Sequence, residues 1–310
     1  MSAPAPEHLL EAAAWLPAQE AHAARADTLT AAHRDRRSRG EKHAVEDFLF
    51  DYYSVRPGAL RRWHPGVGVR LAPGEGTTDL LADRARWRWH RADDGGAVGL
   101  DARAFLIDRG DGVRWLGTLL ARTAARAPQL GCLGMHEWAM VYRAEERRHT
   151  LPLRLGREGT DAVVEANPVR CSHIDAFRFF TAPARPLNRL QPTRANQPDL
   201  EQPGCLHANM DLLKAALKLG PACPGTLLLD CFELARDIRA LDMEASPYDV
   251  TSLGLAPVAV ETAAGRAEYV ERQRSFAERA DPLRRSLLSV TTALLGPSPD
   301  CSPAPVGAHR

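Results

Sequence analysis

The chain has 310 residues, which is enough for one large domain or two small ones. Hydrophobic residues make up 45% and charged residues 25% of the sequence, a balance that suits a folded globular protein and excludes wholesale disorder. Forty lysines and arginines oppose 39 acidic residues, for a formal net charge of +1. This balance argues against a protein that binds nucleic acid through excess charge alone, but it does not exclude a local basic patch.

The sequence predicts a cytoplasmic protein without a membrane partner. No stretch approaches the ~18 uninterrupted apolar residues of a membrane span, and the first twenty residues lack the basic start of a secretory signal. The six cysteines should then be reduced. They form no Cys-x-x-Cys pair, which argues against a zinc ribbon or a thioredoxin-type site.

In chain order, the pattern predicts a mainly α (α+β) fold. Residues 8–38 are rich in Ala, Glu and Arg and favour a helix that ends in a charged linker. Residues 43–55 form another helix, and alternating residues within 66–118 indicate a small antiparallel β subdomain. Residues 113–146 return to a helical pattern, and LPLRL with DAVVEA suggests one more hairpin.

From Ser172 onward the pattern is mostly helical, around a bundle-like core. A long Pro- and Arg-rich loop interrupts it at 182–204, and the last helix runs from near Gly265 toward Leu295. The predicted organisation is therefore an N-terminal helical segment and linker (1–40), a single globular domain (41–296) and a disordered tail (297–310).

The segment GCLGMHEWAMVYR (131–143) carries the first candidate catalytic residue. It is apolar almost all round a helical wheel, so the helix should be buried. Glu137 would lie among Leu133, Met140 and Val141, and such enclosure raises the pKa of a carboxyl as a general acid or base requires. A structural pair with one of the many arginines is the alternative.

The segment CSHIDAFRFF (171–180) offers a second candidate. Ser172 and Asp175 fit a capping box, and this role is favoured for Asp175 over catalysis. His173 would then occupy the first helical position, where the helix N-terminus disfavours its charged form. A neutral imidazole suits metal ligation or contact with an oxyanion.

Two further helical segments carry polar residues beside apolar stripes. In 204–219, Asn209 falls within the apolar face, whereas Asp211 is either functional or a solvated partner of Lys214. In 227–249, Asp237 and Asp242 border opposite edges of the stripe. Acids in such positions are candidates for a pocket wall, and they are also ordinary partners for arginine.

Three histidines share a feature, because a cysteine precedes each of them within four residues. His136, His173 and His207 are therefore candidate ligands of a three-histidine site for a divalent metal, Zn or Fe, with a carboxylate beside them. Their spacing matches no short ligand motif, so chance coincidence is the alternative.

Aromatic and basic residues predict where a substrate binds. The stretch around Tyr52 interleaves aromatic residues with arginines, as sites that stack bases and hold phosphates do, although a core helix with a solvated edge gives the same pattern. A long loop inside a compact domain is often functional, which points to Arg194. The candidate substrate-binding residues are Tyr52, Trp138, Tyr142, Arg178, Arg194 and Asn209.

Six strings together resemble a family of mostly actinobacterial proteins catalogued as 3-methyladenine DNA glycosylases. The resemblance spans about residues 42–295 and rests on DFLFDYYSVRPGALRRWHPG, GMHEWAMVYR, CSHIDAFRFF, ARPLNRLQPTR, GCLHANMDL and CFELARDIRALDM. It implies a hydrolase that cleaves N-glycosidic bonds of damaged or modified purine bases, in nucleic acid or in a nucleoside or nucleotide. Glu137 and Asp237 would then be the acids, and aromatic residues would hold the extruded base.

Two other functions remain open: a metal-dependent enzyme on a small nucleotide-like substrate, and a non-catalytic protein that binds a ligand through its Arg-rich loop. For any chemistry, we expect Glu137, His173, Asn209 and Asp237 to converge in one cavity beneath the 182–204 loop, because each is polar and lies on an apolar segment. Four separate pairs with arginine are the competing expectation.

Overall fold

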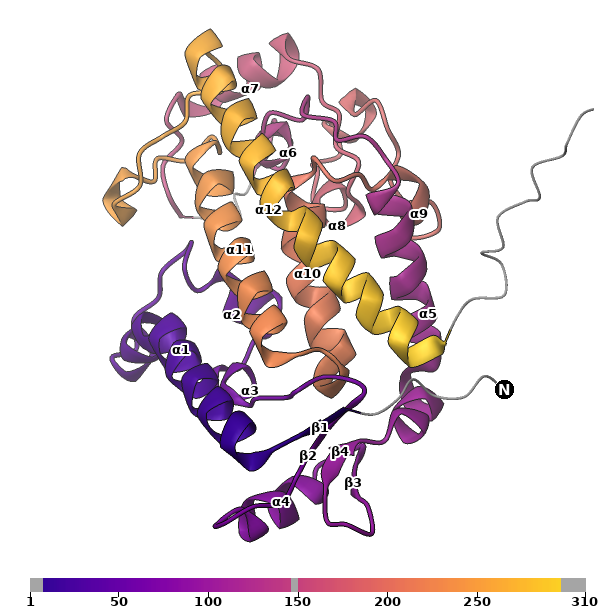
Figure 1. Ribbon diagram of the computed structural model, residues 1–310. Coiled ribbons are helices and arrows are strands. Elements are labelled where there is room, and N and C mark those ends of the chain that lie inside the picture. The colour runs from indigo at the N-terminus through magenta and orange to yellow at the C-terminus, as the bar shows by residue number, and fades with distance from the viewer. Residues whose placement is uncertain (1–7, 146–149, 297–310) are drawn as a thin grey trace, which may run out of the picture.

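The computed structural model describes residues 8–145 and 150–296, and its fold is mainly α-helical with one small sheet (Figure 1). The predicted fold class is therefore confirmed. The centre consists of α10 (Leu206–Leu219), α11 (Gly225–Glu244) and α12 (Ala263–Leu295), with α5 (Ala102–Ala124) alongside α12. The shorter or peripheral helices are α1 (Ala12–Ser38), α2 (Phe48–Tyr52), α3 (Pro57–Arg61), α4 (Thr78–Ala85), α6 (Met135–Ala139), α7 (Gly156–Ala166), α8 (Ile174–Phe177) and α9 (Gln197–Leu200).

The small sheet is mixed, whereas an antiparallel one was predicted. Its order is β1-β2-β4-β3, formed by β1 (His8–Leu10), β2 (Val69–Leu71), β4 (Val98–Leu100) and β3 (His90–Ala92). The pairs β2–β4 and β3–β4 are antiparallel, but β1 pairs parallel with β2, His8 opposite Val69. The difference arises because the N-terminal segment, predicted to be helical from residue 8, supplies the fourth strand.

Two segments predicted as strands are helical. After Asp101, whose side chain accepts a hydrogen bond from the Ala104 amide (2.9 Å), α5 buries Phe105, Val113 and Leu120 along one face. The predicted hairpin of LPLRL and DAVVEA does not form: DAVVEA belongs to α7, where Thr160 and Val164 are buried on one side one turn apart, and Leu153 of LPLRL bridges to Tyr248 instead. Short runs of alternating apolar and polar residues suggested strands. In the structure these segments are helices whose apolar residues lie on one face, and that face is buried in the core.

The helix α1 packs on α3 and α11, so the predicted segment 1–40 and the domain 41–296 share an interface. Arg25 of α1 forms ion pairs with Asp230 (2.7 Å) and Glu233 of α11. Trp15 is fully buried, and its Nε1 donates to the Ala72 carbonyl (3.0 Å). The predicted tail at 297–310 lies outside the described residues.

The 182–204 segment is an ordered connection rather than a structureless loop. It contains a 3-10 turn (Arg185–Leu187) and α9. Asn188 fixes it to the chain before α8, because its Oδ1 accepts from the Cys171 amide (2.7 Å) and its Nδ2 donates to the Cys171 carbonyl (2.9 Å). Within the described ranges, no helix combines the length and apolarity needed to cross a membrane.

Asp47 holds the chain segment that leads into α2. It accepts hydrogen bonds from His33 Nδ1 (2.9 Å), Arg36 Nη2 (2.7 Å) and the His43 amide (2.8 Å), and its side chain is almost wholly buried. Burial raises the pKa of this carboxyl, but the donors from Arg36, His33 and His43 outweigh it and lower the pKa to about 2. Asp47 therefore stabilises the folded chain as an anion.

We expect Asp47→Asn to destabilise the protein in a pH-dependent way. The pKa of this carboxyl falls from 3.8 to about 2 on folding, so above pH ~4 its ionised form adds about 2 kcal/mol to the free energy of unfolding. About half of this contribution is present at pH ~3, and the rest is lost as the pH falls through ~2. Urea unfolding of wild type and variant at pH 6 and pH 3 measures this. A difference in the free energy of unfolding that does not shrink on acidification would contradict it.

Candidate functional site

A cavity of about 860 Å³ opens beside α2, α6, α8, α10 and α11. We call it the tyrosine cavity, because Tyr52, Tyr53 and Tyr248 line it. Phe48 and Phe179 extend the aromatic wall, and Phe48 stacks on Tyr52 with ring centroids 5.0 Å apart. Charged and titratable side chains form the rest of the lining: Lys42, His43, Asp47, Asp51, Glu137, Asp175, His207 and Arg239.

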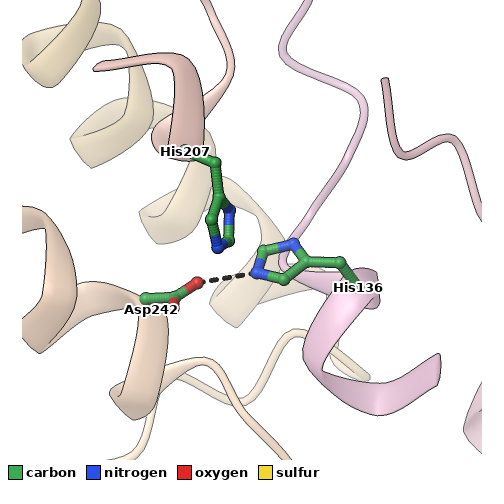
Figure 2. Close-up of side chains that lie close together, drawn as sticks. All are labelled: His136, His207 and Asp242. Atoms are coloured by element: carbon green, nitrogen blue, oxygen red, sulfur yellow. Dashed lines mark hydrogen bonds and ion pairs between the residues drawn. The ribbon is translucent and has the colours of Figure 1, made fainter. Parts of the chain in front are cut away.

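Two histidines and one aspartate meet beside this cavity (Figure 2); His207 lines it, whereas His136 and Asp242 are buried and lie outside its lining. His136 of α6, His207 of α10 and Asp242 of α11 each place one potential ligand atom within 4.8 Å of the other two. His136 Nε2 lies 2.7 Å from Asp242 Oδ1, and the rings of His136 and His207 have centroids 4.6 Å apart. This donor set can hold a divalent metal ion.

The short helix α6 presents His136 and Glu137 in a fixed orientation. The chain enters it through Gly134, whose φ of 68° lies in the left-handed region, and a Cβ there would stand 3.3 Å from the Ala245 Cβ. Trp138 Nε1 donates to the Ala245 carbonyl (2.9 Å), so α6 is tied to the end of α11. All five residues of α6 are buried, as the apolar segment predicted.

The charges in this group are set by Asp242. Burial raises the pKa of its carboxyl, but the attraction and hydrogen bond of His136 outweigh it and hold that pKa far below its usual range. Burial lowers the pKa of His136, yet the same pair with Asp242 raises it well above normal. Burial and the His136 charge lower the pKa of His207 to about 3, so its imidazole is neutral and carries a lone pair.

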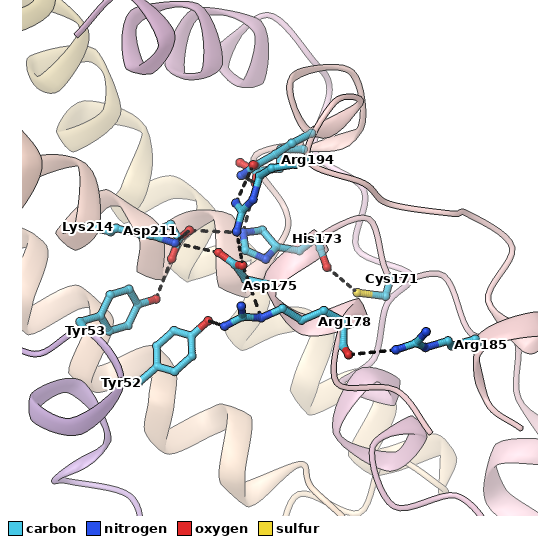
Figure 3. A network of polar contacts seen from close by, with 12 residues as sticks. Tyr52, Tyr53, Cys171, His173, Asp175, Arg178, Arg185, Arg194, Asp211 and Lys214 are labelled. Carbon is cyan, nitrogen blue, oxygen red and sulfur yellow. Dashed lines mark hydrogen bonds and ion pairs between the residues drawn. The ribbon is translucent and has the colours of Figure 1, made fainter. Parts of the chain in front are cut away.

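His173 lies beside this group but belongs to another one (Figure 3). Its ring centroid is 5.5 Å from that of His207, while its Nε2 lies 3.1 Å from Glu201 Oε1 and 3.6 Å from Asp211 Oδ2. Burial lowers its pKa, but the two carboxylates overcome this and raise it to about 10. The predicted neutral His173 is therefore wrong, because the four-residue helix α8 has less influence than two adjacent anions.

Asp175 is a centre of ion pairs, not the predicted helix cap. Its Oδ2 lies 2.7 Å from Lys214 Nζ, and its Oδ1 lies 2.6 Å from Arg194 Nη2 and 3.6 Å from Arg178 Nε. Arg178 also donates to the Tyr52 hydroxyl (3.3 Å). The structure thus brings three predicted substrate-binding residues, Tyr52, Arg178 and Arg194, to one carboxylate at the edge of the tyrosine cavity.

Asp211 pairs with Lys214, but it is more buried than the solvated ion pair that was one of the two predictions for it. Its Oδ1 accepts from the Tyr53 hydroxyl (2.8 Å), and its Oδ2 lies 3.4 Å from Lys214 Nζ. Burial raises its pKa, but His173 and the other donors hold it well below its usual range. Asp211 therefore ties the tyrosine cavity to α10.

The four residues predicted to converge do not share one cavity. Glu137 lines the tyrosine cavity, with its Oε1 3.4 Å from Arg239 Nη1, and His173 lies near by. Asn209 is fully buried elsewhere and donates to the Pro203 carbonyl (3.0 Å). Asp237 lies on the outer side of α11, where it pairs with Arg279 (2.7 Å). It does not line the cavity, so the prediction that it is a catalytic residue is wrong.

Two predicted stacking residues also lie outside the cavity lining. Trp138 is completely buried against Ala245, and the Tyr142 hydroxyl donates to Glu165 (2.9 Å). Glu201 and Tyr248, by contrast, were not singled out, and Arg239 was predicted only as a possible partner of the acids in its own helix. Arg239 precedes Asp242 by one helical turn, and this i,i+3 pair on an apolar stripe was the signal that could have identified it.

The comparisons give no relative for this chain: no family model matches it, and neither curated proteins nor solved structures match it. The resemblance to the glycosylase-named proteins therefore stays a prediction.

Two aspartates of α11 allow a matched stability test. Asp242→Ala leaves the buried charges of His136 and Arg239 without their shared anion, which should cost about 3–5 kcal/mol. Asp237→Ala, at a half-exposed surface pair, should cost less than ~1 kcal/mol. Denaturant unfolding at pH 7 measures both. Equal losses would mean that Asp242 does not organise this region.

Proposed function

We propose that the protein is a metal-dependent enzyme that acts on a small nucleotide-like substrate bound in the tyrosine cavity. The observation that carries the proposal is the group of His136, His207 and Asp242, which reaches the cavity through His207. Two histidines and one carboxylate suit Zn or Fe(II) and leave further coordination positions for water or substrate. A divalent ion held there would polarise a substrate oxygen or lower the pKa of bound water.

The surrounding residues fit such a site. Arg239 Nη1 donates to Asp242 Oδ2 (2.7 Å), which orients the carboxylate and leaves Oδ1, now paired with His136, as the atom for a metal. Glu137 follows His136 in the chain and lines the same cavity, so it can accept or donate a proton at the substrate.

The substrate class follows from the lining of the tyrosine cavity. Phe48, Tyr52 and Tyr53 provide faces for a planar base. Lys42, an exposed residue of the lining, provides positive charge for a phosphate or another anionic group. A free nucleoside or nucleotide fits a cavity of about 860 Å³, and the near-zero net charge gives no general attraction to duplex DNA.

The second candidate is N-glycosidic hydrolysis of damaged or modified purines, as the sequence resemblance implies. The placement of Glu137 beside the tyrosines favours it, because an acid close to a stacked base can assist departure of that base. In this alternative Glu137 acts without Asp237. We also propose a cytoplasmic location, which agrees with the five free cysteines of the described chain.

Metal content is the direct test of the first candidate. Protein purified without an affinity tag should retain about one Zn or Fe per chain. His207→Ala should lower the metal retained after dialysis at least ~10-fold, because a ligand is lost. His90→Ala, a histidine at the sheet, is the matched control and should leave it unchanged. Equal metal content in all three proteins would refute the metal site.

Base release separates the two candidates. If the second is right, methylated DNA or 3-methyladenine nucleosides should release free base, and Glu137→Gln should slow the release at least ~100-fold. Glu165→Gln, which removes the exposed carboxylate that pairs with Arg143, should have no effect. Release that persists in EDTA and depends on Glu137 would favour the glycosidase over the metal-dependent enzyme.

A further inference from the structure

A second cavity, of about 510 Å³, lies on the other side of α10, between α10, α5 and α12. We call it the arginine cavity, after Arg284. Its walls include apolar side chains from two helices, among them Leu116, Leu119 and Leu120 of α5 and Leu212 of α10. Exposed Arg109 and Lys218 also line it, so its opening to solvent is basic. No residue of the proposed metal site lines this cavity.

Arg284 is the unusual group in the arginine cavity. Its side chain is buried, with 1% of the residue exposed, and its Nη2 donates to Asn209 Oδ1. Its Nη1 has no hydrogen-bond partner, and among the described residues no carboxylate lies within ion-pair distance of the guanidinium. A buried cation without an anion is costly, and anion binding would offset that cost.

A second unsatisfied donor lines the same cavity. Thr123 of α5 is buried, and its Oγ1 has no hydrogen-bond partner in the described structure. The helices α5 and α12 lie side by side and run in opposite directions (Figure 1), and Gly117 faces Thr291. Thr123 is six residues after Gly117, and Arg284 is seven residues before Thr291. Because the two helices run in opposite directions, both residues lie on the same side of the Gly117–Thr291 contact, about 10 Å from it along the helix axes.

No acidic residue of the lining forms an ion pair with Arg284, and Glu201 attracts it only at longer range. Glu201 accepts from Gln197 Nε2 (2.5 Å) and faces His173. Asp211 is engaged by Tyr53 and His173, and Asp108 pairs with Arg88 (2.8 Å). Each carboxylate thus has a partner other than Arg284, which leaves the cavity with a surplus of positive charge.

We propose that the arginine cavity is a second binding site, for a small aliphatic carboxylate. Arg284 Nη1 and the Thr123 hydroxyl are two separate single donors, and they match the two oxygens of one carboxylate. The leucine walls match an alkyl chain, and the basic opening attracts the anion. This site does not depend on the chemistry proposed for the tyrosine cavity.

Decanoate is the probe, measured by isothermal titration calorimetry on the full chain at pH 7. We expect saturable binding with one site per chain, and at least ~10-fold weaker binding of 1-decanol, which lacks the charge. Arg284→Met should weaken decanoate binding at least ~10-fold, and Thr123→Val at least ~3-fold. Arg285→Met is the matched control and should bind as wild type does, because Arg285 is exposed and pairs with Asp281 (2.7 Å).

A variant of the apolar wall guards against a folding artefact. Leu119→Trp keeps Arg284 intact and fills the cavity, so it should also abolish binding while circular dichroism shows an unchanged helix content. Equal affinity in Arg284→Met and Arg285→Met would overturn the proposal, as would the absence of decanoate binding to wild type. Tighter binding of inorganic phosphate than of decanoate at the same Arg284 would overturn the assigned ligand class.

Discussion

The buried carboxylate of Asp242 is the constraint on which the centre of this protein depends. It lies with no exposed surface between His136 of α6 and Arg239 of α11, at 2.7 Å from each. An anion in such a place needs both partners, and the partners need the anion. The short helix α6 is therefore held against α11 by charge as well as by packing, and Glu137 is carried into the cavity as a consequence.

The same interaction extends into the wall of the tyrosine cavity. The Arg239 guanidinium that bonds Asp242 lies 4.0 Å from the centre of the Phe48 ring and 3.4 Å from a Glu137 oxygen. A chain of contacts thus runs from His136 through Asp242 and Arg239 to Glu137, and of these four residues Arg239 and Glu137 line the cavity.

The sequence predicted α11, α12 and most of α1, but it assigned the first part of α5 to strands. The apolar stripe of 227–249 and the all-apolar segment of 131–143 identified α11 and the buried α6, because burial there follows helical spacing. Asp237 and Asp242 show the limit. They are five residues apart, which places them about 140° apart on a helix. Spacing alone does not say which of them faces α6 and which faces Arg279 of α12.

His173 shows a second limit of the sequence. Its place at the start of α8 predicted a neutral ring, but its protonation depends on Glu201 and Asp211, which come from distant parts of the chain. The candidate metal ligands differ from the predicted set for the same reason. His136 and His207 lie together as expected, but the third member of the group is Asp242 and not His173. Long-range electrostatic partners are a property of the packed helices and not of any local motif.

The placement of anions between the two cavities accounts for the character of both. Asp211 faces Tyr53 on one side and lines the arginine cavity on the other, while its charge is taken up by His173 and Lys214. Glu201 is likewise directed to His173. The positive charge of His173 also lowers the pKa of His207, after burial and His136, and helps to keep that ring neutral. Asp211 and Glu201 both lie within ion-pair distance of His173, and neither lies within that distance of Arg284. One cationic histidine in the wall therefore pairs with both carboxylates and helps to keep the His207 ring neutral, while Arg284 Nη1 is left without a hydrogen-bond partner.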